Sequence, residues 1–275
     1  MVDVGPFALR RLEAMADGVL AEAGVAGVLP TPLEALREIA RVRAVAPVEA
    51  LPVAGSGRRL LGAFWFEERI LYVDERQSAV RRRFTEAHEL IHALCPWHEA
   101  VLREDTEGEL FRPAREAVEA EANAGAGLLI FQGSAFGRRA AAAACAIESA
   151  MALAAEHGAS VHATLHHYAQ THPAAVAMLT VGRFPRRDGS LPVWRSVESP
   201  AFRRRHGRAA DHYPDGLRPG TALHALVEAA RTSSGCPADA VRLSDGRLVA
   251  AQAHYNRHAF LLMLVDKGRA LARAA

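Results

Sequence analysis

The sequence predicts an α+β protein, with a small sheet and an amphipathic helix near the N-terminus, a helical middle segment and a C-terminal mixed α/β region. Three observations support this prediction. Apolar residues recur at helical spacing between Ser78 and Leu94. Short runs rich in β-branched and aromatic residues, separated by turn residues, precede this helix over residues 47–74. Near the C-terminus, the turn signal "SDGR" divides the apolar run 240–266 and predicts a β-hairpin.

Two helices and several strands are expected before the amphipathic helix. Apolar positions over residues 7–24 follow a helical rhythm that Gly24 ends. A second helix is expected to start with Thr31 as its N-cap and Pro32 at its first position, where proline fits the helical backbone. The strand "RILYV" (69–73) follows, and we expect it to be an exposed edge strand that could hold an extended peptide.

The middle of the chain is predicted to be mostly helical. Ser78 is the expected N-cap of the amphipathic helix, and Pro96 ends that helix because proline cannot continue it. Residues 99–113 are predicted to form a polar loop. Three further helices are expected: one from about Ala114, an alanine-rich one from Arg138 to Glu156, and one from Val161 with Ser160 as its N-cap.

Composition and turn signals divide the chain into three segments. We expect a first domain over residues 1–137, a helical segment over 138–182, and a C-terminal domain over 183–275 that is richer in Pro, Gly and Arg. The middle segment has helix-turn-helix character. However, its second helix offers mainly histidines where a DNA reader would present Arg, Asn or Gln to the bases, so direct DNA binding is not expected.

The bulk composition is that of an ordinary globular protein. The formal net charge of +2 is too small to indicate nucleic-acid binding by itself. The 3 cysteines are widely spaced and predict neither a disulfide framework nor a cysteine-based metal site. The N-terminus lacks the apolar core of a signal peptide, and no segment has the roughly 18 uncharged apolar residues that span a bilayer. We therefore expect a cytoplasmic protein that does not enter a membrane.

The amphipathic helix carries His88, Glu89 and His92 in an H-E-x-x-H arrangement, which is typical of zinc peptidases but also occurs by chance. Residues four apart lie on one face of a helix, so both imidazoles can reach one ion while Glu89 projects beside them. A Zn²⁺ with three protein ligands keeps one open position and lowers the pKa of its water toward about 7. Glu89 can then accept the proton and deliver it to a leaving amine.

The third ligand has two possible sources. His98 follows six residues after His92, where one class of zinc peptidases places a third histidine beyond a glycine that allows a sharp turn. This chain has Cys95 in place of that glycine, and the next residue, Pro96, pushes Cys95 toward an extended backbone. We therefore expect His98 to be a loop histidine, and the third ligand to be a carboxylate from a second helix.

Three glutamates of that second helix are candidates. Glu119 and Asn123 stand four apart and face the same way, so Glu119 can bind the metal while Asn123 accepts the free N–H of a bound imidazole. Glu116, one turn earlier, is the main rival, and Glu121 points to another face and is expected to be solvated. A neighbouring stripe of small and apolar residues would pack this helix closely against the first: Val118, Ala122, Gly125 and Leu129.

The segment "RRRFTEAHELIHAL" resembles the R-x-R-F-T-x-A-H-E-x-x-H signature of the ImmA/IrrE family of metallopeptidases. The segment "EAEANAGAGLLI" is similar to the family's second-helix motif, E-x-x-x-N followed by small residues. The resemblance covers roughly residues 58–132 and implies a zincin-like domain. It further implies one zinc ion, with His88, His92 and Glu119 as its ligands, Glu89 as the catalytic base, and Asn123 as a hydrogen-bond partner of a ligand.

Two departures from the family pattern concern loop geometry rather than the ligand set. Asp74 stands where family members often have Asn, and residues 130–132 replace the usual Met-Pro. Substrate-binding residues are not assigned, and the candidates for stabilising an oxyanion are Tyr72, His162, His166 and Tyr168.

Family members are cytoplasmic proteases that cleave a helix-turn-helix repressor and so switch on stress-response or mobile-element genes. The resemblance therefore implies a protein substrate of the XRE-type repressor class, and a C-terminal region that is GAF-like in some relatives. We predict a zinc-dependent, site-specific endopeptidase. The alternatives are a non-catalytic regulatory protein that retains the zinc site, and another zinc hydrolase.

Overall fold

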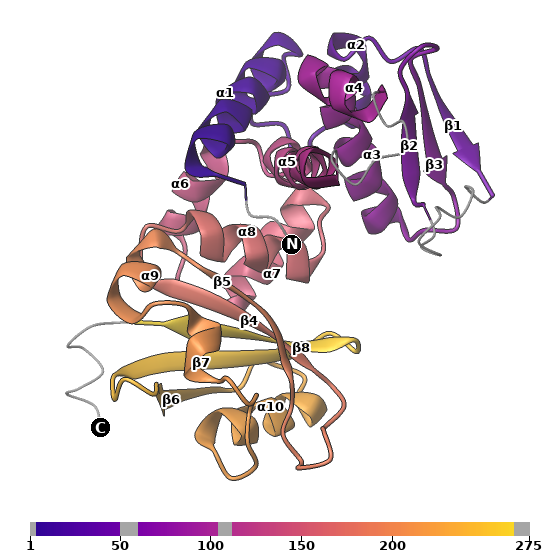
Figure 1. Cartoon of the computed structure of the whole chain (residues 1–275). Coiled ribbons are helices and arrows are strands. Elements are labelled where there is room, and N and C mark those ends of the chain that lie inside the picture. Colours follow the sequence, from indigo (N-terminus) through magenta and orange to yellow (C-terminus); the bar gives the residue numbers. More distant parts are fainter. Residues whose placement is uncertain (1–3, 50–59, 104–111, 267–275) are drawn as a thin grey trace. The chain divides into compact units, whose positions relative to one another are not determined.

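The computed structural model describes residues 4–49, 60–103 and 112–266 (Figure 1). The chain forms two compact units and contributes to each of them twice. The first unit comprises Met1–Phe136 and Ala155–Ser160, and the second comprises Gly137–Ala154 and Val161–Ala275. The mixed α+β class is confirmed. The division into three segments at residues 137 and 182 stays a prediction.

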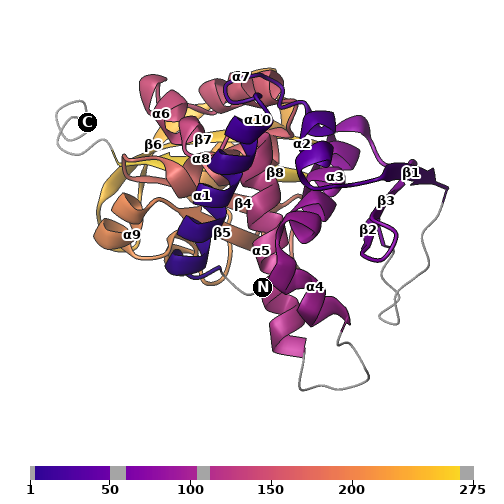
Figure 2. The ribbon, with the colours of Figure 1, turned by 90° about the horizontal axis from the view of Figure 1, so that it is seen from above.

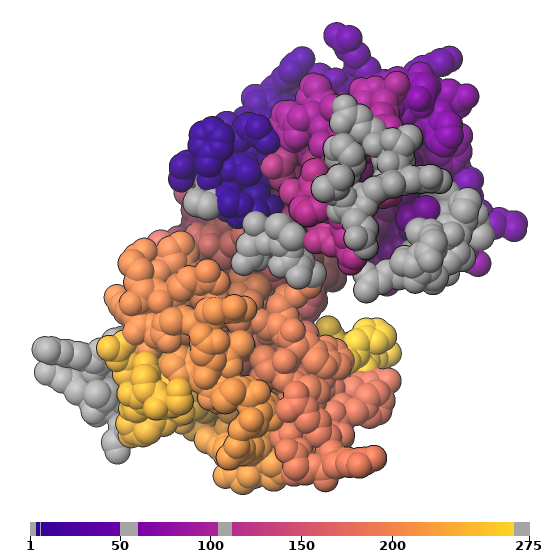
Figure 3. Space-filling view, viewed as in Figure 1, coloured from indigo at the N-terminus to yellow at the C-terminus, as the bar shows by residue number. Residues whose placement is uncertain are grey.

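The first unit is built in layers around α3 (Ala79–Leu94). This helix contacts strands β2 and β3 of a three-stranded sheet and also contacts α5 (Arg112–Ile130), which in turn contacts α1 (Pro6–Glu22) (Figure 2). The outer side of α1 is exposed to solvent (Figure 3). The remaining elements of the unit are α2 (Leu33–Ile39), β1 (Ala44–Val48), β2 (Gly62–Trp65), β3 (Ile70–Asp74) and α4 (Pro96–Arg103).

The sheet of the first unit has the order β1-β3-β2, so β3 is its central strand. β3 runs parallel to β1 and antiparallel to β2, with Leu71 and Val73 buried. The expectation that "RILYV" is an exposed edge strand is therefore wrong. Among the described strands, β2 is the edge strand beside α3, and its short sequence "GAFW" gives no local sign of that position.

Helix α3 follows its prediction, but the chain after it does not. The Ser78 side chain accepts the backbone N–H of Arg81, as an N-cap does, and the helix ends before Cys95, which has an extended backbone. Pro96 then starts α4 directly, because proline suits the first turn of a helix as well as the end of one. The loop predicted over residues 99–113 is thus helical up to Arg103, and residues 104–111 lie outside the described ranges.

Two other local predictions are corrected by long-range contacts. Pro32, not Thr31, is the N-cap of α2, since the Thr31 hydroxyl donates instead to the carbonyl of Leu129 at 3.0 Å. The single alanine-rich helix expected from Arg138 to Glu156 is two helices, α6 (Ala135–Ala142) and α7 (Ile147–His157). The side chain of Gln252 accepts the backbone N–H of Ile147 at 2.8 Å and so caps the second of them.

The close packing of α5 on α3 depends on Gly125, as the stripe of small residues predicts. A Cβ atom at Gly125 would lie only 2.7 Å from Cδ1 of Ile91, a fully buried side chain of α3. Gly18 of α1 is the control position for Gly125, because it is also a helical glycine but a Cβ there would meet nothing within 4 Å.

We expect Gly125→Ala and Gly18→Ala to change the stability of the protein in opposite directions. Alanine in a helix interior is favoured over glycine by about 1 kcal/mol, and this gain should be seen at the open position. At Gly125, overpacking that costs about 1–3 kcal/mol should outweigh it. Urea unfolding of both variants checks this, and equal stabilisation by both would show that α3 and α5 are not tightly packed.

The second unit is built on a five-stranded antiparallel sheet of order β5-β4-β8-β7-β6. Helix α10 (Ala222–Thr232) contacts β6, β7 and β8, and α8 (Val161–Thr171) contacts β4 and β5. Strands β4 and β8 are buried along their whole length, as central strands between two layers should be. The strands and the two remaining helical segments are β4 (Val176–Gly182), β5 (Val193–Glu198), α9 (Pro200–His206), η2 (Ala209–His212), β6 (Ala238–Arg242), β7 (Leu248–Tyr255) and β8 (Ala259–Val265).

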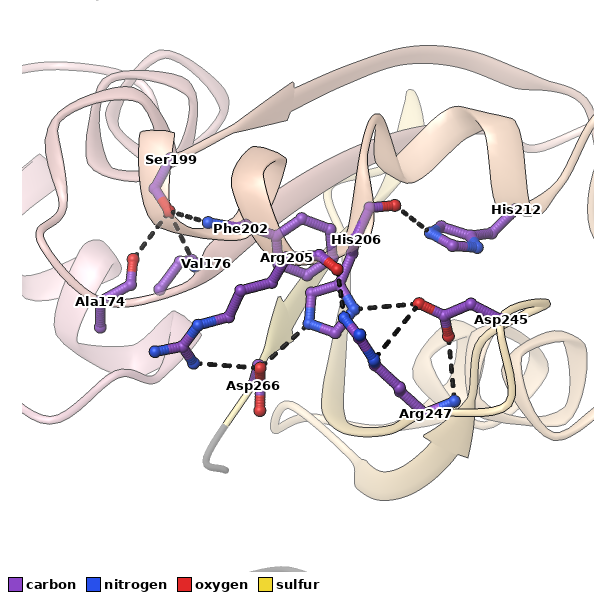
Figure 4. A network of polar contacts seen from close by, with 10 residues as sticks. All are labelled: Ala174, Val176, Ser199, Phe202, Arg205, His206, His212, Asp245, Arg247 and Asp266. Carbon is purple, nitrogen blue, oxygen red and sulfur yellow. Dashed lines mark hydrogen bonds and ion pairs between the residues drawn. The ribbon is translucent and has the colours of Figure 1, made fainter. Parts of the chain in front are cut away.

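A buried histidine connects three parts of this second unit (Figure 4). Nδ1 of His206, at the end of α9, lies 3.3 Å from Oδ2 of Asp245 in the β6–β7 turn, and its Nε2 lies 3.0 Å from Oδ2 of Asp266 after β8. This turn is formed by the predicted "SDGR" segment, and the pairing of β6 with β7 confirms the expected hairpin.

Within the part of the chain that the structure describes, none of the helices has the length and apolar content that crossing a bilayer requires.

Candidate metal centre

Three side chains from two neighbouring helices meet beside the sheet of the first unit. His88 and His92 stand one turn apart on α3, and their Nε2 atoms lie 3.1 Å apart. Glu119 on α5 reaches the same point, with Oε2 3.2 Å from Nε2 of His88 and Oε1 3.8 Å from Nε2 of His92. One possible ligand atom from each residue lies within 4.8 Å of the others.

The donor set and its spacing fit a zinc ion. Two nitrogen or oxygen ligands at 2.0–2.1 Å from a tetrahedral zinc lie about 3.3–3.4 Å apart. The nitrogen–nitrogen distance of 3.1 Å and the nitrogen–oxygen distance of 3.2 Å are close to that value, and the third distance needs only a small rotation of a half-exposed carboxylate. Two imidazoles and a carboxylate also leave one coordination position open, as catalytic zinc sites do.

Glu89 lies on the sheet side of the histidine pair and is buried. The backbone N–H of Phe64 in β2 donates a hydrogen bond to its carboxylate. Burial and the nearby charge of Glu119 raise the pKa of Glu89 to about 7, although the neighbouring His88 opposes this shift. The side chain is thus held against the edge strand and is able to exchange a proton near neutral pH.

A pocket of about 600 Å³ opens onto this group. It is lined by the edge strand β2 on one side and by α3 and α5 on the other, with His88, Glu89 and Glu119 in its wall. Gly62 at the start of β2 allows the strand to approach α3, because a Cβ there would lie 2.5 Å from Thr85 and 2.8 Å from the Glu89 carboxylate. The glycine thereby lets the strand and the carboxylate lie side by side.

The side chain of Asn123 contacts the ring of His88. It lies one turn after Glu119 and hydrogen-bonds the side chain of His88, while its amide N–H donates to the Glu119 carbonyl at 2.8 Å. Burial alone would lower the pKa of His88, but hydrogen bonds to Glu119 and Asn123 and the charge of Glu89 raise it above its ordinary value. Asn123 therefore lies where the sequence predicts an outer contact to one imidazole.

His98 is not one of the three side chains that could hold the metal, and it does not lie in a loop. It lies on α4, is fully buried, and its Nδ1 is 3.0 Å from Nδ1 of His92. Its Nε2 lies 3.2 Å from Oε2 of Glu121. Burial and the nearby charge of His88 lower the pKa of His92 to about 3, and burial also lowers that of His98. Burial therefore favours the neutral form of both rings.

The other sequence candidates fall in different places. Glu116 is exposed and pairs with Arg112 one turn earlier. The expectation that Glu121 is solvated is wrong. Helix α4 covers its side of α5, and its carboxylate accepts the indole N–H of Trp97 at 2.8 Å. Of the oxyanion candidates, Tyr72 is not among the described residues that line the pocket, and His162, His166 and Tyr168 belong to the second unit.

The comparisons with known proteins agree with this geometry. A peptidase family model described as the IrrE N-terminal-like domain matches residues 51–168, a range that includes the three grouped side chains, Glu89 and Asn123. This match, over less than half of the chain, supports membership of the ImmA/IrrE family. The match confirms the resemblance found in the motifs and indicates a domain of metallopeptidase type over these residues.

The fold of this chain is also found in a solved structure. A Mycobacterium tuberculosis transcriptional regulator matches it with a TM-score of 0.61 at 16% sequence identity, over 95% of this chain and 78% of the other. At that identity the likeness concerns the fold alone. None of the curated proteins matches the chain.

Proposed function

We propose that this protein is a zinc-dependent, site-specific endopeptidase that cleaves an XRE-type helix-turn-helix repressor in the cytoplasm. The observation that carries the catalytic part is the meeting of His88, His92 and Glu119 within 4.8 Å, beside the buried carboxylate of Glu89. The match of residues 51–168 to a peptidase family model supports the peptidase class. The repressor as substrate, and the derepression of stress-response or mobile-element genes, follow from the resemblance to relatives that act in this way.

In this proposal each residue of the site has a separate task. His88, His92 and Glu119 hold one Zn²⁺, which when bound supplies a Lewis acid that polarises the scissile carbonyl and acidifies the attacking water. Glu89 accepts a proton from that water on a carboxylate oxygen and transfers it to the nitrogen of the leaving amine as the C–N bond breaks. General bases act best when their pKa is near the working pH, and the pKa of Glu89, raised to about 7 by burial, meets that condition.

The edge strand β2 offers a way to hold the substrate. Its residues Gly62–Trp65 line the pocket, and among the described strands it pairs only with β3. An extended segment of the repressor can pair with the free edge of β2 and so pass its peptide bond across the metal group. Leu60 and Trp65, both exposed at the pocket, provide apolar contacts for the side chains of that segment.

Arg115 is our candidate for the group that stabilises the oxyanion. It lines the pocket one helical turn before Glu119, with which it interacts electrostatically. A cation placed where negative charge develops on the carbonyl oxygen stabilises the transition state. Its position four residues before the ligand carboxylate is the signal in the sequence that would have identified it.

Cleavage of a candidate repressor tests the proposed function. The full-length protein with zinc is incubated with a helix-turn-helix regulator encoded by a neighbouring gene, and products are resolved by mass spectrometry. We expect a single cut that a chelator abolishes and added zinc restores, while an unrelated helix-turn-helix protein stays intact. A chain that binds zinc and cleaves none of the neighbouring regulators would contradict the proposal.

A non-catalytic regulatory protein is the second candidate, favoured by the fold similarity to a protein described as a transcriptional regulator.

We also propose that residues 138–182 form a helix-turn-helix-like packing segment and that 183–275 form a GAF-like regulatory domain. Helix α8 supports the first idea, because it contacts β4 and β5 and buries Leu165 and Tyr168 rather than presenting a reading face to DNA. The five-stranded antiparallel sheet supports the second.

A further inference from the structure

We propose that His98 and Glu121 position the metal ligand His92 by determining which of its ring nitrogens carries the proton. This inference rests on the role of His92 in the proposed function. It concerns a row of three side chains that leads from the metal group into the space between α3, α4 and α5. The row begins at His92, continues through His98 and ends at Glu121.

The direction of the hydrogen bonds is set at the Glu121 end of the row. The indole N–H of Trp97 and the guanidinium of Arg11 both lie against the Glu121 carboxylate, at 2.8 Å and 3.4 Å. Neither group can accept a hydrogen bond, so the carboxylate must accept from both. The same oxygen, Oε2, lies 3.2 Å from Nε2 of His98. His98 therefore donates its Nε2–H to Glu121.

The rest of the row follows from the chemistry of a neutral imidazole. A neutral ring that donates from one nitrogen accepts at the other, so Nδ1 of His98 is an acceptor. The only partner within its reach in this row is Nδ1 of His92 at 3.0 Å, which must then carry a proton and donate it. The lone pair of His92 is left on Nε2, the atom that faces His88 and Glu119.

This arrangement prepares His92 for a metal before the metal arrives. A histidine ligand needs an unprotonated nitrogen directed at the ion, and an outer acceptor on its other nitrogen typically contributes 10–100-fold to metal affinity, on the order of the losses seen when such contacts are removed. His98 is 0% exposed, so water cannot replace it as that acceptor. Asn123 makes the corresponding contact to His88, and the two imidazoles thus have different outer partners.

Zinc affinity of the full-length chain tests the proposal. Competition with a chromophoric chelator should show that His98→Leu, which has neither acceptor nor donor, binds zinc about 10–100-fold more weakly than the wild type. His98→Gln should recover most of this loss, because one amide offers an oxygen to His92 and an N–H to Glu121. Glu121→Leu should weaken binding as His98→Leu does, whereas Glu116→Leu on the same helix should not.

A second buried histidine provides the control for general damage to the unit. His157 is also 0% exposed and lies in the first unit, away from the metal group. His157→Leu should lower the melting temperature of the metal-free protein without changing its zinc affinity. Equal zinc affinity in the wild type and in His98→Leu would overturn the proposal while leaving the proposed function intact. A wild type that binds no zinc would instead contradict the proposed function.

The tautomers can also be read directly, without any variant that must fold. Long-range ¹H–¹⁵N correlation spectra of the metal-free wild type should show His92 protonated at Nδ1 and His98 protonated at Nε2. A His92 ring protonated at Nε2 would overturn the proposal, because it would mean that His98 donates to His92 from its own Nδ1. This measurement reports on proton placement alone, which a purely structural role of His98 would not determine.

Discussion

Glu89→Gln should still bind zinc but should cleave the repressor about 10²–10⁴-fold more slowly, the range that a positioned general acid–base contributes. The amide has the same shape as the carboxylate and can still accept the backbone N–H of Phe64, so the edge strand and the helix should stay in place. What it cannot do is take a proton from water. Zinc content by atomic absorption, measured beside single-turnover cleavage, separates the two effects.

Glu116→Gln is the matched control for this prediction. Glu116 is an exposed carboxylate on α5 that pairs with Arg112, so the change removes one negative charge without touching the pocket. It should cleave the repressor at the wild-type rate. Full activity in Glu89→Gln would mean that another group removes the proton, and the mechanism proposed for this site would be wrong.

Glu119→Ala should have the largest effect on metal binding of any single change in α5. It removes one of three proposed ligands, so we expect a loss of zinc affinity greater than the roughly 10–100-fold that outer contacts contribute. Cleavage should disappear with the metal. The side chain is half exposed, so its removal creates no buried cavity, and the metal-free protein should melt at the wild-type temperature.

Glu116→Ala separates the two carboxylates that compete for this role. The two residues are one turn apart on the same helix, and both are exposed enough to be truncated without a packing cost. Isothermal titration with zinc should show a weak or absent site in Glu119→Ala and an unchanged one in Glu116→Ala. The reverse order would make Glu116 the ligand and would require α5 to be rotated relative to α3.

The local parts of the fold could be predicted because they depend on neighbouring residues. The Ser78 cap, the apolar face of α3 and the hairpin around Gly246 are all set within one element or one turn. The order of the strands could not be predicted in this way. The central strand is the one that pairs with β1, and this pairing is a long-range contact. Because β2 and β3 are both short and apolar, their own sequences do not show which of them makes it. The break between α6 and α7 depends likewise on Gln252, more than a hundred residues away.

The candidate site shows the same limit at closer range. Helical spacing and family resemblance pointed to His88, His92, Glu119 and Asn123, and the structure brings these side chains together. The positions of His98 and Glu121 could not be inferred, because both depend on α4. Once Pro96 starts a new helix, His98 turns inward behind His92 and the side of α5 that carries Glu121 is covered. A search for histidines near the motif finds His98, but only as a rival ligand.

The unit that carries the candidate metal centre is discontinuous along the chain, and this limits how the protein can be shortened. Residues 155–160 return to the first unit, where the His157 ring packs on Phe131 and Phe136 and donates to the carbonyl of Ile130 at 3.0 Å. A stop codon just after Phe136 would keep every residue of the candidate metal centre. It would, however, remove the packing of His157 against the C-terminal end of α5. A shortened or proteolytically clipped form that ends there would therefore lack part of the unit that carries the candidate metal centre.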